Sequence, residues 1–105
     1  MWILQRSEPG DRAKTFRLRA GAVKTVGRAP RADFVLDAAL VSRLHCRLTA
    51  TDEALEVVDL SSTNGTFVND KRVKQATLAA GDRLRIGRVE LTIEKSKAKV
   101  KSEKD

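Results

Sequence analysis

Val89-Glu90-Leu91-Thr92-Ile93-Glu94 alternates apolar and polar side chains at every step. Successive side chains of a β-strand point to opposite faces of a sheet, so this pattern is typical of a strand with one buried face. Working outward, the same alternation occurs in Cys46-Arg47-Leu48-Thr49-Ala50 and in the shorter run Phe16-Arg17-Leu18-Arg19. No window keeps the spacing of about 3.6 residues that marks an amphipathic helix. The pattern therefore predicts an all-β chain of short strands.

Turn-forming residues separate these runs at close spacing. Glycine, proline, asparagine and aspartate each favour tight turns for a different steric or hydrogen-bonding reason. They occur at Pro9-Gly10-Asp11, Ala20-Gly21, Ala29-Pro30, Ser61-Ser62-Thr63-Asn64-Gly65, Asn69-Asp70 and Gly81-Asp82. Many short strands with regular turns favour a two-sheet β-sandwich of mainly antiparallel strands. Its loops gather at the two ends, and a ligand site is expected at one of them.

The charge of the chain is strongly positive. Its 105 residues suit one domain, and 21 Lys and Arg against 14 Asp and Glu give a formal net charge of +7. Residues 95–105 contain five lysines, two acids and little to bury, so we expect a disordered lysine-rich tail or linker after a folded domain at 1–94. The tail accounts for +3 and leaves +4 on the domain, a modest surplus for a DNA-binding protein. An anionic partner is indicated, but nucleic acid, acidic membrane and phosphorylated protein stay open.

Several classes of protein are excluded by composition. No apolar run approaches the roughly 18 residues of a membrane span, and the start lacks a basic region followed by an apolar run. The single cysteine, Cys46, cannot form an internal disulfide, and its alternating context predicts a small buried side chain. With one cysteine and one histidine, a metal site is not expected. We expect a soluble intracellular protein of the cytosol or nucleus, with no membrane partner.

Three segments between strands carry polar residues suited to an anion. Gly27-Arg28 follows a predicted strand, Ser42-Arg43-Leu44-His45 precedes another, and Thr63-Asn64-Gly65-Thr66 lies in a predicted turn. Together they supply guanidinium groups, hydroxyls, an imidazole and an amide. Asn-Gly favours a turn with positive φ.

With Asn69 and the later pattern Leu78-x-x-Gly81-Asp82-x-Leu84-x-Ile86-Gly87, these motifs resemble a forkhead-associated domain, the phosphothreonine-binding β-sandwich. The match covers nearly all of residues 1–94. The resemblance implies a sandwich of eleven short strands that holds a phosphopeptide across loops at one end, without a cofactor and without catalysis. It also implies a preference for phosphothreonine over phosphoserine.

The resemblance assigns a role to each site residue. Arg28 is expected to contact the phosphate oxygens, because a guanidinium offers a rigid fork of donors to an anion. Ser42 would contribute its hydroxyl and its backbone amide, and Arg43 and Thr63 further phosphate contacts. Asn64 would bind the peptide backbone, since its amide both donates and accepts.

Four further residues are expected to support the site rather than touch the ligand. His45 would brace the loops, and Gly27, Gly65 and Asn69 would shape them. Ser42 and His45 invite a hydrolase hypothesis, but the sequence shows no Gly-x-Ser-x-Gly elbow, so no enzyme is predicted.

Two other functions remain open besides the favoured one. A basic β-sandwich could bind nucleic acid, or the same fold could bind unphosphorylated protein surfaces. Against stacked nucleic acid, the aromatic residues are predicted to lie in the core: Trp2, Phe16, Phe34 and Phe67. The expected partners are phosphothreonine-containing segments of proteins, with no small-molecule substrate, and the isolated domain is expected to be monomeric.

Overall fold

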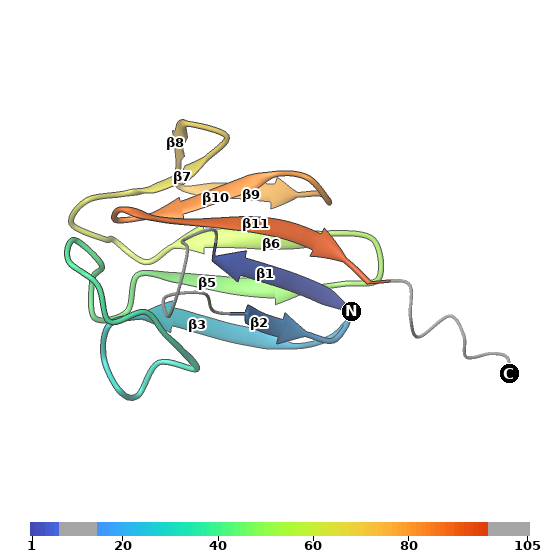
Figure 1. Ribbon diagram of the computed structural model, residues 1–105, viewed down its shortest axis with the longest axis horizontal. Helices are drawn as coiled ribbons and strands as arrows, with labels where there is room; N and C mark the ends of the chain where they lie inside the picture. Colours follow the sequence, from blue (N-terminus) through green and yellow to red (C-terminus); the bar gives the residue numbers. More distant parts are fainter. Residues whose placement is uncertain (7–14, 97–105) are drawn as a thin grey trace, which may run out of the picture.

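In the computed structural model, which describes residues 1–6 and 15–96, these residues form eleven strands and no helix (Figure 1). The six-stranded sheet contains, in spatial order, β2 (Thr15–Leu18), β1 (Trp2–Arg6), β11 (Val89–Lys95), β10 (Arg83–Ile86), β7 (Thr66–Val68) and β8 (Lys71–Val73). The five-stranded sheet contains β4 (Phe34–Val35), β3 (Val23–Gly27), β5 (Cys46–Ala50), β6 (Leu55–Asp59) and β9 (Gln75–Leu78). All pairings are antiparallel except that of β3 with β4. The predicted two-sheet sandwich is confirmed; the turn predicted at Pro9-Gly10-Asp11 lies outside the described residues.

The core lies between the two sheets and is made by the inward faces of the alternating strands. Cys46, Leu48 and Ala50 of β5 are buried, while Arg47 between them is exposed. β11 follows the same rule, with Val89, Leu91 and Ile93 at 0 or 1% exposure. Burying one such aliphatic side chain completely stabilises the folded state by about 1.5 to 3 kcal/mol relative to leaving it exposed. Burial raises the pKa of the Cys46 thiol, which fits the predicted role of a core-filling side chain.

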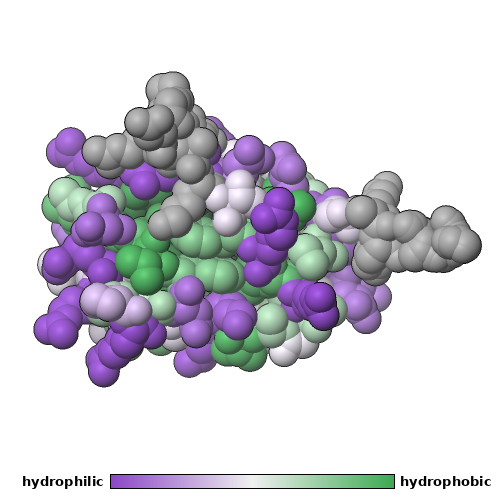
Figure 2. Space-filling view, turned by 60° about the horizontal axis from the view of Figure 1, so that its bottom comes forward, coloured by the Kyte–Doolittle hydropathy of each residue, from purple (hydrophilic) through white to green (hydrophobic). Residues whose placement is uncertain are grey.

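The aromatic residues divide between the core and the surface. Trp2 and Phe16 are buried, and Phe34 packs against the core with its ring stacked on Phe16 at a centroid distance of 4.5 Å. Figure 2 looks at the side of the sandwich where β2 and β3 lie and shows apolar side chains there among hydrophilic ones. The prediction for Phe67 is wrong. Thr66 faces inward at 0% exposure, so the alternation of β7 turns Phe67 outward, where the Arg85 guanidinium lies 4.2 Å from its ring centroid.

The first and last described residues meet at the end of the sandwich opposite the loops 28–33, 36–45 and 60–65 (Figure 1). Lys95 pairs with Trp2, and Ser96 N donates to Met1 O at 2.8 Å. Trp2 Nε1 in turn donates to Thr51 O at 2.8 Å and links the two sheets. Strand pairing therefore extends through Lys95, one residue beyond the predicted domain end. Residues 97–105 of the predicted tail lie outside the described residues.

Candidate functional site

An open groove of about 820 Å³ lies among the loops at one end of the sandwich. The predicted ligand-binding residues all line it, although they come from three separate loops: Arg28, Ser42, Arg43, Thr63 and Asn64. The rest of the lining comes from Asp37, Ala38, Ala39, Leu40, Val41, Leu44 and Ser61. The groove thus combines two guanidinium groups, hydroxyls and an amide with an apolar wall.

Gly27 lets the loop that carries Arg28 lie directly against the loop that carries Ser42. A Cβ on Gly27 would stand 2.0 Å from the carbonyl oxygen of Arg43, far inside van der Waals contact. Arg28 N donates to Ser42 O at 2.9 Å and fixes the same approach. On the side chain, Arg28 Nε donates to Val41 O at 3.1 Å, and the remaining guanidinium donors have no partner among the described residues. Arg28 is therefore oriented by the protein and still has donors to offer a ligand.

His45 joins two of the loops from beneath the groove. It is fully buried, and its Nδ1 accepts a hydrogen bond from Ser42 N at 3.0 Å. Since Nδ1 is the acceptor, Nε2 carries the proton and donates to Gly65 O at 2.8 Å. Both ring nitrogens are used by backbone groups, so the imidazole has no nitrogen left to take a proton from the Ser42 hydroxyl. The geometry does not form a Ser-His catalytic pair.

Ser42 and Thr63 hold the two loops together at the groove surface. Thr63 N donates to Ser42 Oγ at 3.1 Å, which leaves the hydroxyl hydrogen of Ser42 available to a ligand. The Thr63 hydroxyl makes no hydrogen bond within the described part of the chain. The expectation that the backbone amide of Ser42 also serves the ligand is wrong, because that amide donates to His45.

Asn64 spans the groove to the facing loop. Its Nδ2 donates to Leu40 O at 3.1 Å, and its Oδ1 accepts no hydrogen bond from the described residues. Gly65 follows with φ of +92°, the conformation predicted for the Asn-Gly turn. The side-chain amide of Asn64 is thus held in place, and its Oδ1 can still accept a hydrogen bond from a ligand.

Asp59 organises the third loop, a role that the sequence analysis missed. Its Oδ1 accepts from the hydroxyls of Ser62 and Thr66 at 2.5 and 2.6 Å, and its Oδ2 accepts from Ser62 N at 3.1 Å. The Ser62 hydroxyl then accepts from Gly65 N at 2.9 Å. Burial alone would raise the pKa of Asp59, but these hydrogen bonds outweigh it and hold that pKa below its ordinary value.

Asp59→Asn is expected to lower the free energy of unfolding at pH 7 by about 1 to 2 kcal/mol, because an amide NH₂ would then face donors. A depressed folded-state pKa stabilises the protein above the ordinary carboxyl value, and that stabilisation is lost as pH falls through the lowered value. Urea unfolding of both proteins from pH 7 down to pH 3 should therefore show the difference shrinking below about pH 4. A difference that stayed constant with pH would mean that the Asp59 charge does not hold the loop.

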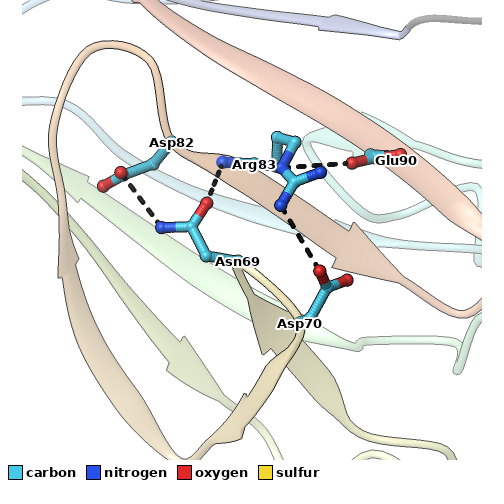
Figure 3. A network of polar contacts seen from close by, with 5 residues as sticks. All are labelled: Asn69, Asp70, Asp82, Arg83 and Glu90. Atoms are coloured by element: carbon cyan, nitrogen blue, oxygen red, sulfur yellow. Dashed lines mark hydrogen bonds and ion pairs between the residues drawn. The ribbon is translucent and has the colours of Figure 1, made fainter.

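Asn69 supports the fold at a distance from the groove. With φ of 50° it forms the β7–β8 turn, where its Oδ1 accepts from Arg83 N at 3.0 Å and its Nδ2 donates to Asp82 Oδ1 at 3.1 Å (Figure 3). The prediction that it shapes the third loop is wrong. β7 separates it from that loop, and it ties the β7–β8 turn to the β9–β10 turn instead.

Among residues 1–6 and 15–96, no three His, Cys, Asp or Glu side chains come together in a way that could hold a metal ion. These residues also contain no helix that is long and apolar enough to cross a bilayer.

Comparisons of sequence and of structure with known proteins agree on one domain family. The FHA domain family model matches residues 24–87. The glycogen accumulation regulator GarA of Mycobacterium tuberculosis is 41% identical over 70 residues, which cover 67% of this chain and 43% of GarA. The chain thus spans less than half the length of this curated relative.

Two solved structures share the whole sandwich. One comes from work on phosphothreonine-dependent FHA domain interactions, with a TM-score of 0.82, 34% identity and coverage of 90% of this chain and 96% of that one. The other is the FhaA FHA domain complexed with the intracellular domain of Rv3910, with a TM-score of 0.81, 34% identity and coverage of 90% and 100%.

Proposed function

We propose that this chain, which belongs to the FHA domain family, is a binding module that recognises phosphothreonine in partner proteins. The observation that carries the proposal is the convergence of Arg28, Ser42, Arg43, Thr63 and Asn64 on one groove. The likeness to an FHA domain studied for phosphothreonine-dependent interactions supports the same ligand class.

The phosphate would be held by charge-assisted hydrogen bonds. A phosphate ester carries about −1.5 to −2 charges at neutral pH, and the exposed guanidinium groups of Arg28 and Arg43 line the groove from two loops. The hydroxyls of Ser42 and Thr63 each have a hydrogen to donate. Each bond to the charged group contributes about 1.5 to 3 kcal/mol, so a few of them offset the ordering of a flexible peptide. Without the phosphate that compensation is lost, which makes phosphorylation the switch.

Asn64 would hold the main chain of the ligand beside the phosphate. No described residue bonds to its Oδ1 or to the second hydrogen of its Nδ2, so these can pair with a peptide N–H and C=O. Because such bonds involve only the backbone of the ligand, they hold it extended whatever its side chains are.

The module binds and does not catalyse. Ser42 is the hydroxyl nearest to a histidine in sequence, and His45 is committed to backbone partners on both nitrogens. A phosphoester held in this groove therefore meets donors that stabilise it, while the imidazole beside Ser42 is not available as a general base. We also place the module inside the cell, where protein kinases write phosphothreonine.

Calorimetry with one peptide in four forms tests the proposal: phosphothreonine, threonine, phosphoserine and glutamate. We expect a Kd on the order of micromolar for phosphothreonine, weaker binding of phosphoserine and no measurable binding of threonine. Glutamate should bind poorly because it carries one charge. Equal affinity for threonine and phosphothreonine would replace the proposal with a scaffold that binds unphosphorylated surfaces. Gel shifts with and without residues 95–105 would reveal a nucleic-acid-binding protein.

A further inference from the structure

A row of four side chains crosses the outer face of the six-stranded sheet. Arg72 of β8, Phe67 of β7, Arg85 of β10 and Glu90 of β11 are successive cross-strand partners. The guanidinium of Arg85 lies over the Phe67 ring, 4.2 Å from its centroid. A guanidinium that stacks on an aromatic ring keeps the donors at its edge free for an anion.

The nearby carboxylates are already used by a third arginine. Arg83 Nη2 lies 3.3 Å from Asp70 Oδ2, and Arg83 Nε lies 3.7 Å from Glu90 Oε2 (Figure 3). Within the described part of the chain, no acidic side chain forms an ion pair with Arg72 or Arg85. Glu90 and Asp70 are paired with Arg83, so Arg72 and Arg85 add two positive charges to this face that no carboxylate of the described residues pairs with.

This positive surface adjoins the proposed phosphate groove. The Nε atom of Arg72 lies only 2.7 Å from the point where a Cβ of Gly65 would stand. Gly65 directly follows Asn64, which lines the groove, so the missing side chain leaves the space that the Arg72 guanidinium occupies. The surface therefore continues from Thr63 and Asn64 across Gly65 to Arg72.

We propose that Arg72, with Phe67 and Arg85 beside it, binds a second anionic side chain of the same segment whose phosphothreonine lies in the groove. The inference rests on the proposed function. The second anion is a carboxylate or a second phosphate, since both suit an exposed guanidinium. An extended segment advances about 3.3 Å per residue, so this anion would lie about two to four residues from the phosphothreonine.

Fluorescence anisotropy of labelled peptides tests the inference. One phosphothreonine peptide has neutral flanks, two others carry glutamates two to four residues before or after the phosphothreonine, and two more carry a second phosphothreonine there. We expect one flank to bind the wild type about threefold to fivefold tighter when it is acidic, with a larger gain for phosphate. Arg72→Gln should remove that gain and leave the neutral peptide unchanged. The gain should also shrink as salt rises.

Arg83→Gln is the matched control, because Arg83 is an exposed arginine on the same face whose charge is already paired. It should keep the full preference for the acidic flank. The inference is overturned if the neutral peptide binds but neither acidic flank gains, or if Arg72→Gln weakens all peptides equally. An Arg72-dependent affinity for a single-stranded oligonucleotide, without any effect on peptides, would overturn it as well. Failure of every peptide to bind would instead remove the proposed function.

Discussion

Arg28→Ala is expected to reduce affinity for a phosphothreonine peptide by about 30-fold to 1000-fold and to leave the thermal melt nearly unchanged. The substitution removes the charge-assisted hydrogen bonds from Arg28 to the phosphate, and because water and neighbouring donors replace them in part, we expect a net loss of about 2 to 4 kcal/mol in binding free energy. The fold loses little, because Arg28 is exposed and its side chain makes one hydrogen bond to the described residues, from Nε to Val41 O. Calorimetry measures the affinity, and scanning calorimetry measures the melt.

Two further variants distinguish the effect of the guanidinium geometry from the effect of net charge. Arg31→Ala removes another exposed arginine of the same loop, one that does not line the groove, so binding should survive. Arg28→Lys keeps the charge without the fork and should bind with intermediate affinity. Full affinity in Arg28→Ala would remove this residue from the site.

His45→Ala should lower stability and binding together. The change leaves Ser42 N and Gly65 O without their buried partner and opens a cavity under the groove. We expect a loss of about 3 kcal/mol in the free energy of unfolding, which corresponds to a fall of about 10 to 20 °C in Tm. Binding measured well below the new Tm should also weaken, because Ser42 and the third loop lose their common brace.

Cys46→Ala tests whether destabilisation alone explains the binding loss. Cys46 is the next residue and equally buried, but its side chain lies in the core and not under the loops. Its truncation should lower the Tm while peptide affinity holds. A His45→Ala protein of wild-type stability with a selective binding defect would show that the imidazole acts on the ligand itself.

The strands were predictable where alternation is unambiguous. In β5, and in β11 as far as Ile93, every second residue is apolar, so the buried face follows from the sequence. Phe67 lies between Thr66 and Val68, where hydrophobicity alone favours the aromatic residue for the core. The hydroxyl of Thr66 instead has a buried acceptor in Asp59, which makes the inward position favourable for threonine and sends Phe67 to the surface.

The groove-lining residues were predictable from motif order, but their hydrogen bonds were not. Whether the Ser42 amide faces a ligand or His45 depends on the path of the loop backbone, which residue identity does not specify. Asp59 could have been found, since Asp-x-x-Ser in Asp59-Leu60-Ser61-Ser62 is a common side-chain cap of a turn. Asn69 follows the third loop closely in sequence, yet β7 carries the chain away from the groove before the turn begins.

The meeting of Met1 and Ser96 at the end away from the groove has a consequence for how the domain can be built into larger proteins. A polypeptide can therefore enter and leave the sandwich at neighbouring points, both at the end opposite the groove. Sequence attached at either terminus then need not pass in front of the loops. A neighbouring domain could be exchanged or lengthened without blocking the groove. The length of the linker between the two domains would then set how far the groove can reach for a partner.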